Sequence, residues 1–155
     1  MSKFTIGVGC DEAAYHLKET VRTDLEKRGH TVKDYGVYNT EPSLYPDIAL
    51  AVSQAVAEGE QERGILMCGT GIGMAITANK VPGIRAAVCH DVYSAERARK
   101  SNDCQVMALG ARVVGEEYAK RLVESWLDSD FEGGKSAAKV ERIKEIEQEF
   151  TSTKK

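Results

Sequence analysis

A cysteine followed by three closely spaced glycines is the part of this sequence best suited to chemistry. A short apolar run ends in Cys68, and Gly69, Gly71 and Gly73 follow at once. The pattern predicts a strand, a glycine-rich turn and a helix over residues 74–80. Such a turn directs backbone N–H groups at an anion, and the helix dipole adds to the attraction. A thiol beside it predicts chemistry as well as binding; the structural alternative is a tight strand-to-helix turn without a ligand.

The turn differs from the two common nucleotide-binding motifs. The dinucleotide fingerprint requires Gly-x-Gly-x-x-Gly, and the P-loop ends in Gly-Lys-Ser/Thr. Here the glycines are two residues apart throughout, and no Lys-Ser/Thr pair follows. Nicotinamide cofactors and nucleoside triphosphates are therefore disfavoured as ligands.

Length and charge narrow the class of protein. The chain has 155 residues and a formal net charge of −3. This length predicts one domain over residues 1–150, followed by a disordered tail over 151–155. The acidic balance argues against a nucleic-acid partner. No apolar run is long enough to span a membrane, and the N-terminus is strand-like rather than a signal peptide, so a cytoplasmic location is expected.

The four cysteines do not form a metal-binding or disulfide pattern. No Cys-x-x-Cys or Cys/His spacing occurs among them, which disfavours a zinc site. A thiol-redox role for Cys68 would lack a resolving cysteine at that distance. Cys10, Cys89 and Cys104 are expected to be small buried core residues. Cys68 is the exception because of its glycine neighbours.

Strand-like and helix-like segments alternate along the chain. The expected strands are 4–9, 31–35, 64–67, 85–89 and 105–109, and the expected helices are 13–28, 48–57, 74–80, 92–100, 115–127 and 137–150. Short, apolar strands separated by helices predict an α/β fold with a parallel sheet covered on both faces.

Three polar segments should meet at one edge of this sheet. Ligands of parallel sheets bind beyond the carboxyl ends of the strands. Cys10-Asp11-Glu12 follows the first strand, 68–73 the third and His90-Asp91 the fourth. We expect these segments to converge there.

With these motifs in place, the chain resembles the ribose-5-phosphate isomerase B / galactose-6-phosphate isomerase family over residues 3 to roughly 148. The matching segments are Asp11, Tyr45-Pro46-Asp47, 68–74, 78–80, 83–86, 101–103, 110–115 and 131–134. The resemblance implies a Rossmann-like three-layer fold with a five-stranded parallel sheet. It also implies cofactor-free and metal-free isomerisation of aldose and ketose phosphates. Members act as homodimers or as tetramers, with active sites shared between subunits.

The resemblance assigns roles to particular residues. Cys68 is the base, while Thr70 and Asp11 move the oxygen-bound proton of a cis-enediolate intermediate. Substrate is expected to contact the turn and neighbouring side chains: Tyr45, Gly69, Gly71, Ile72, Gly73, Met74, His90 and Asn102. Backbone N–H groups of 69–74 would stabilise the enediolate, each donor contributing about 3 kcal/mol. Arg112 would bind the phosphate, together with Lys135 and Lys139 of the other subunit.

Two positions depart from the family pattern. Glu12 stands where many members have a histidine, and it is expected either to point away from the phosphate or to bind a hydroxyl. Ser101 stands where many pentose-phosphate isomerases have a ring-opening histidine. The main expectation is a ribose 5-phosphate/ribulose 5-phosphate isomerase. The alternative is an isomerase of D-erythrulose 4-phosphate and D-erythrose 4-phosphate, which form no such furanose. His90 would either open the ring or cap the next helix.

The sequence is also compatible with other classes of function. A non-catalytic phosphosugar-binding protein would keep the turn and the basic residues without needing Cys68 or Asp11. A flavodoxin-like module is suggested by fold analogy alone. Val140, Ile143 and Ile146 form an apolar stripe on the last helix, which would pack either on its own sheet or across a dimer.

Overall fold

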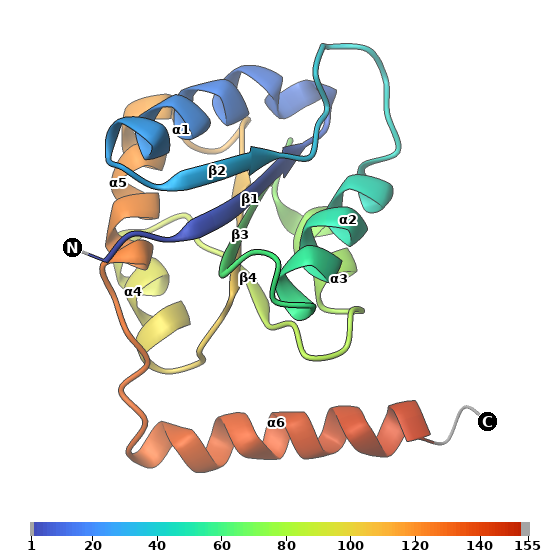
Figure 1. Cartoon of the computed structure of the whole chain (residues 1–155), viewed down its shortest axis with the longest axis vertical. Coiled ribbons are helices and arrows are strands. Elements are labelled where there is room, and N and C mark those ends of the chain that lie inside the picture. The colour runs from blue at the N-terminus through green and yellow to red at the C-terminus, as the bar shows by residue number, and fades with distance from the viewer. Residues whose placement is uncertain (1, 153–155) are drawn as a thin grey trace.

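The computed structural model describes residues 2–152 as a sheet with helices on both sides (Figure 1). The strands are β1 (Thr5–Cys10), β2 (Thr31–Asp34), β3 (Arg63–Cys68), β4 (Ala86–Val88) and β5 (Val106–Gly110). The helices are the 3-10 turn η1 (Glu12–Ala14), α1 (Tyr15–Lys27), α2 (Tyr45–Ala57), α3 (Ile72–Ala78), α4 (Val92–Lys100), α5 (Glu116–Leu127) and α6 (Lys135–Ser152). None of the helices in this range is long and apolar enough to cross a membrane.

The sheet has five parallel strands in the order β2-β1-β3-β5-β4. This confirms the predicted α/β class. After β1 the chain continues to β2 on one side of the sheet. After β3 it continues to β4 and then to β5 on the other side, so the direction of the strand order switches between β1 and β3. Parallel sheets bind their ligands at such a switch in strand order, beyond the carboxyl ends of the strands.

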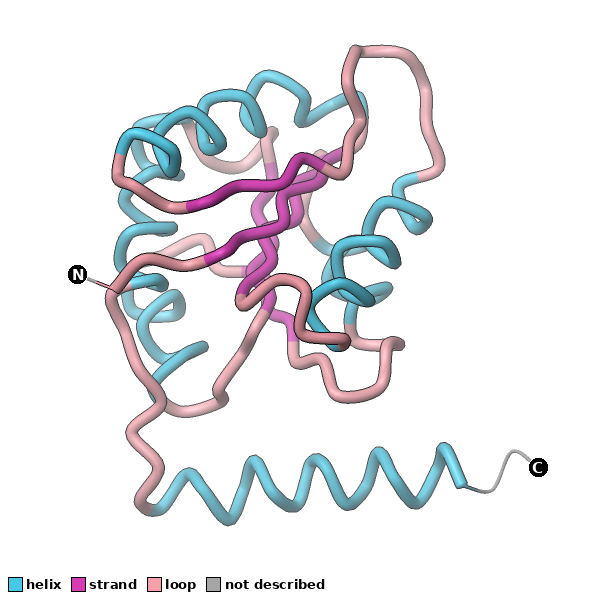
Figure 2. Tube along the Cα trace, viewed as in Figure 1, coloured by secondary structure: helices cyan, strands magenta, loops and turns pink. Residues whose placement is uncertain are grey.

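Alternate residues of each strand enter the two cores. Ile65 and Met67 face the core under α1, α4 and α5, whereas Leu66 and Cys68 face the core under α2 and α3. The three layers are visible as helices on either side of the strands in Figure 2. Burial of each large aliphatic side chain contributes about 1.5–3 kcal/mol, so both faces stabilise the sheet. The carboxyl ends of the strands are therefore held in place by a packed core on each face of the sheet.

Several element boundaries differ from those predicted. The helix expected over 13–28 is divided into η1 and α1, and α2 begins at Tyr45 rather than at residue 48. Pro46 lies in the first turn of α2, where its missing N–H is tolerated. Similarly, α3 begins at Ile72, which places the helix closer to the glycines than expected.

The last helix, α6, lies apart from the sheet in Figure 1. Val140 is buried, but Ile143 and Ile146 of the same stripe remain exposed. A carboxylate oxygen of Glu147 accepts a hydrogen bond from the N–H of Gly83 at 3.0 Å. The helix extends through Ser152, so the predicted tail begins as helix; residues 153–155 lie outside the described residues.

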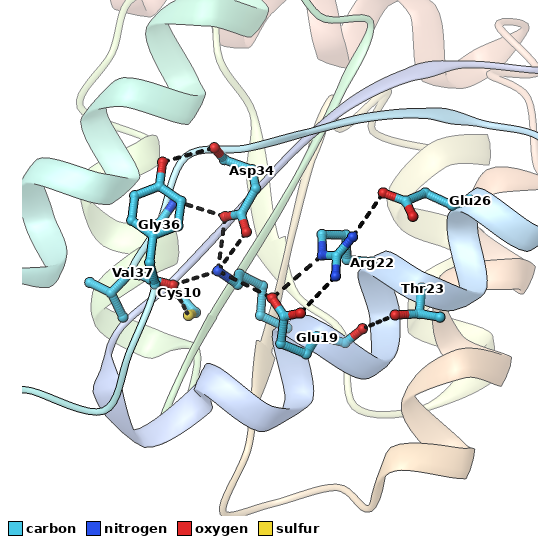
Figure 3. A network of polar contacts seen from close by, with 10 residues as sticks. Cys10, Glu19, Arg22, Thr23, Glu26, Asp34, Gly36 and Val37 are labelled. Atoms are coloured by element: carbon cyan, nitrogen blue, oxygen red, sulfur yellow. Dashed lines mark hydrogen bonds and ion pairs between the residues drawn. The ribbon is translucent and has the colours of Figure 1, made fainter.

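A buried lysine fixes the start of the long loop between β2 and α2. The side chain of Lys18 is 0% exposed, and its amine lies 2.9 Å from each carboxylate oxygen of Asp34. The amine also donates to the carbonyl of Val37, and Asp34 accepts from the N–H of Gly36. In Figure 3 the labelled Asp34, Gly36 and Val37 converge at this point. The pair thus fixes residues 34–37 where the loop leaves the sheet.

Candidate active site

Cys68 ends β3, and its sulfur lies under the glycine-rich turn. The N–H of Gly71 donates a hydrogen bond to this sulfur, with nitrogen and sulfur 3.1 Å apart. Gly71 has a φ of 79°, and a Cβ there would lie 3.0 Å from the carbonyl carbon of Leu109. Glycine alone avoids both the strain and the clash. The turn therefore depends on this glycine to direct an N–H at the thiol.

Tyr45, a predicted substrate contact, lies directly against the turn. A Cβ on Gly73 would be only 2.4 Å from the hydroxyl oxygen of Tyr45, so the phenol ring contacts bare backbone. Tyr45 is the first residue of α2, and α2 packs on the same side of the sheet as α3. The first turn of one helix thus brings a hydroxyl to the start of the other.

Asp11 follows β1 and lies beside the end of β3. Its N–H donates to the carbonyl of Met67 at 3.1 Å, and its carboxylate accepts from the N–H of Ala14 at 3.1 Å. Burial raises the pKa of Asp11, although the bond from Ala14 and the charge of Arg112 oppose this shift. A carboxyl with a raised pKa is better suited to accept and return a proton near neutral pH.

Arg112 supplies a cation at the mouth of this site. Its N–H donates to the carbonyl of Gly69 at 3.0 Å, which joins the loop after β5 to the loop after β3. A Cβ on Gly69 would lie 3.4 Å from a guanidinium nitrogen of Arg112, so the side chain extends over the turn. The predicted phosphate ligand is therefore beside the predicted base.

The hydroxyl of Thr70 and the neighbouring backbone N–H groups form hydrogen bonds within the turn. The hydroxyl oxygen of Thr70 accepts from the N–H of Ile72 at 3.2 Å. Gly71 and Ile72 thus direct their N–H groups at Cys68 and Thr70. The expectation that the N–H groups of 69–74 stabilise an enediolate stays a prediction.

His90 reaches the same edge from β4, with a defined tautomer. Its Nε2 accepts a hydrogen bond from the N–H of Gly110 at 2.8 Å, so this nitrogen carries no proton. Burial lowers the pKa of His90 and favours the neutral ring. Asp91, not His90, caps α4, because its carboxylate accepts from the N–H of Ser94 at 2.7 Å. The expected convergence of the segments after β1, β3 and β4 is confirmed.

Glu12 has a protein partner that the sequence did not suggest. Its carboxylate accepts from the backbone N–H of Ser43 at 3.2 Å and from the hydroxyl of Ser43 at 2.9 Å. Hydrogen bonds from its own N–H and from Ser43 hold the pKa of Glu12 below its ordinary value, and Arg112 adds to this effect. Ser43 lies in a polar loop without periodicity, so no pattern pointed to it.

Ser101 and Asn102 lie at the other edge of the sheet, because they precede β5 whereas Cys68 ends β3. The hydroxyl of Ser101 accepts from Nε of Arg97 at 2.7 Å. Arg97 was missed, although its four-residue spacing from Ser101 on a helix is a recognisable signal. Within one chain, the structure does not bring Asn102 to the base.

The lysines predicted to bind the phosphate are also separate from Cys68, the predicted base, within one chain. Lys135 and Lys139 belong to α6, which lies apart from the sheet. A cavity of about 500 Å³ opens between β4, α4 and α6, with Arg85, Arg97, Asn102 and Ile143 in its wall. Part of the predicted site therefore lies at a second location on the molecule.

Comparison with known proteins identifies the family. The Ribose/Galactose Isomerase family model matches residues 6–143. The chain belongs to this family. It is 57% identical over 140 residues to D-erythrulose-4-phosphate isomerase of Pectobacterium atrosepticum, covering 90% of this chain and 92% of the relative. It is 54% identical over 143 residues to ribose-5-P isomerase B of Listeria innocua, covering 92% and 97%.

A solved structure supports the same conclusion. The chain superposes on ribose-5-phosphate isomerase B of Clostridium thermocellum with a TM-score of 0.93 and 48% identity, covering 94% of this chain and 99% of the other. These relatives confirm the Rossmann-like fold and the predicted enzyme class, that of the sugar-phosphate isomerases. Among residues 2–152, no group of three or more His, Cys, Asp and Glu side chains is arranged to hold a metal ion.

Proposed function

We propose that this enzyme interconverts D-erythrulose 4-phosphate and D-erythrose 4-phosphate. The observation that carries the proposal is Ser101, whose hydroxyl is held by Arg97 at 2.7 Å where a pentose isomerase would need a ring-opening imidazole. A four-carbon sugar with its O4 esterified cannot close the furanose through that oxygen. Its open chain therefore requires no ring opening. The erythrulose-phosphate isomerase named among the relatives supports the same substrate.

In the proposed reaction, Cys68 acts as the base. Starting from the ketose, the thiolate removes a proton from C1, and the C1–H electron pair forms the double bond of a cis-enediolate. The same thiol returns the proton to C2, which gives the aldose without any net oxidant or reductant. The hydrogen bond from the N–H of Gly71 supports this role, because it directs a backbone donor at the sulfur.

The oxygen-bound proton requires a second group. In the proposal, Asp11 and Thr70 transfer it between O1 and O2 as the carbonyl moves. The raised pKa of Asp11 suits this role. Tyr45 contacts a substrate hydroxyl over Gly73, and Arg112 attracts the phosphate from the mouth of the site.

We further propose that two copies share each site. Ser101 and Asn102 lie at the opposite ends of the strands from Cys68 of their own chain, and α6 lies apart from the sheet. A second copy would therefore supply Ser101, Asn102, Lys135 and Lys139. The exposed Ile143 and Ile146 of α6 support such a contact, because an apolar stripe is better buried than solvated. Light scattering should then report a dimer or larger assembly, and truncation after Gly134 should abolish activity; a fully active monomer would exclude shared sites.

Ribose 5-phosphate is the second candidate substrate. His90 favours it, because this imidazole lies at the edge where the sugar would bind. A relative named ribose-5-P isomerase B, 54% identical, supports this alternative as well.

A substrate panel separates the candidates. We expect kcat/KM for erythrulose 4-phosphate to exceed that for ribose 5-phosphate by at least about tenfold, equivalent to roughly 1.4 kcal/mol in the transition state. Hexose phosphates serve as the length control. A tenfold preference for the pentose would overturn the tetrose proposal. A protein that binds sugar phosphates without turning any of them over would instead be a phosphosugar-binding protein.

A further inference from the structure

The loop between β2 and α2 is held to the body of the protein at its two ends. Lys18 and Asp34 hold its first residues, and Ser43 holds its last. For residues 39–43, the hydrogen bonds that reach beyond the segment, within residues 2–152, are the two from Ser43 to Glu12. In Figure 1 this loop arches away from the sheet before it enters α2. Glu12 is therefore the polar anchor for the distal part of the loop.

This anchor is two residues away from a predicted substrate contact. Ser43 is followed by Leu44 and then by Tyr45, whose hydroxyl lies against Gly73. Leu44 is the N-cap of α2 and provides no side-chain hydrogen bond to the helix, and its side chain is 74% exposed. The first turn of α2 thus lacks a cap of its own. Its approach to the glycine turn depends on where Ser43 is held.

We infer that Glu12 is a positioning residue, which binds Ser43 and thereby holds Tyr45 over the glycine-rich turn. Glu12 acts on substrate binding through Tyr45 and takes no part in proton transfer at Cys68. The inference deepens the proposed function and rests on it, since it presumes that Tyr45 contacts the sugar.

The negative charge of Glu12 would change KM in the opposite direction. Its carboxylate lies near enough to Arg112 for the arginine to lower the pKa of Glu12. If Glu12 acted mainly as a charge, it would compete with the substrate phosphate for Arg112, and its removal would lower KM. If it acts as an anchor, its removal raises KM. The direction of the change therefore separates the two roles.

The test is a mutant cycle with steady-state kinetics. We expect Glu12→Ala to raise KM about fivefold while kcat changes less than about twofold. Glu12→Gln keeps an oxygen acceptor for Ser43 and should restore most of the loss. Ser43→Ala removes the hydroxyl bond and should have an intermediate effect. Glu41→Ala, which removes an exposed carboxylate from the same loop, is the charge-matched control and should leave KM unchanged.

Making Glu12→Ala in a Tyr45→Phe variant shows whether Glu12 changes KM through Tyr45. In this background, Glu12→Ala should change KM by much less than it does in the parent. An equal increase in both backgrounds, or a decrease in KM for both Glu12 variants, would overturn the positioning role.

Amide hydrogen exchange tests the anchor independently of turnover. Glu12→Ala should accelerate exchange over 38–46 while exchange in β1 and β3 stays unchanged. If the parent enzyme turned over no sugar phosphate, the proposed function would fail and this measurement alone would judge the anchor. Unchanged exchange over 38–46 would overturn it.

Discussion

The backbone nitrogen of Gly71 lies 3.1 Å from the sulfur of Cys68 and donates a hydrogen bond to it. The left-handed conformation of Gly71 makes this contact possible, because the chain reverses there and returns its N–H to the end of β3. A strand end, a turn and a helix start therefore act together to place a donor on one thiol. The predictions below begin from this contact.

Replacement of Cys68 should remove turnover but not binding. We expect Cys68→Ser to lower kcat by at least about 10²-fold, because the hydroxyl is a much weaker base than the thiolate at neutral pH. Substrate affinity, measured by calorimetry, should change little. Cys104→Ala is the matched control, since Cys104 is buried away from the turn and should affect stability rather than kcat. Full activity in Cys68→Ser would exclude this base.

Addition of one methyl group to Gly73 should displace Tyr45. The new Cβ would lie 2.4 Å from the hydroxyl oxygen of Tyr45, so the ring must move away from the turn. We expect Gly73→Ala to raise KM by about tenfold or more. Gly115→Ala is the control, because a Cβ there meets no atom within 4 Å. Equal kinetics in the two variants would contradict the close contact.

The sequence was sufficient to predict the sheet and the edge at which its polar segments meet. Apolar strands between helices predicted the parallel sheet, and the position of Cys68 after the third strand predicted where its sulfur lies. Pro46 could also have placed the start of α2, since proline favours the first turn of a helix.

Other contacts depend on distances that no local pattern encodes. Glu12 and Ser43 are 31 residues apart and meet only because the loop after β2 folds back over η1. The resemblance grouped Asn102 with Cys68, although Asn102 precedes β5 whereas Cys68 is the last residue of β3. The stripe on α6 likewise fitted two packing arrangements equally well, and the helix proved to lie apart from the sheet.

Loss of the nearest partner of buried Lys18 should destabilise the whole protein. Asp34→Ala would remove the carboxylate that lies 2.9 Å from an ammonium group with 0% exposure, while the carbonyl of Val37 and the more distant carboxylate of Glu19, at 3.7 Å, would remain. We expect the free energy of unfolding to fall by about 3 kcal/mol in urea denaturation. Arg142→Ala removes an exposed arginine that pairs with Glu145 and should cost much less. Equal losses in the two variants would show that the buried pair adds nothing beyond a surface pair.

Acidification should destabilise the fold through His30. Nδ1 of His30 accepts the N–H of Phe4 at 3.1 Å, and burial, with Lys3 and Arg28 nearby, lowers the pKa of the ring. The unfolded chain therefore binds a proton near its ordinary pKa of about 6.5, whereas the folded chain does so only at lower pH. The contribution of His30 to stability is fully present above the unfolded pKa of about 6.5. It is lost as the pH falls from there through the lower pKa of the folded state. Urea midpoints between pH 7.5 and 5 should decline, and His30→Gln should flatten this decline relative to a matched His16→Gln variant on the exposed face of α1. Parallel declines in both variants would assign the acid sensitivity to other groups.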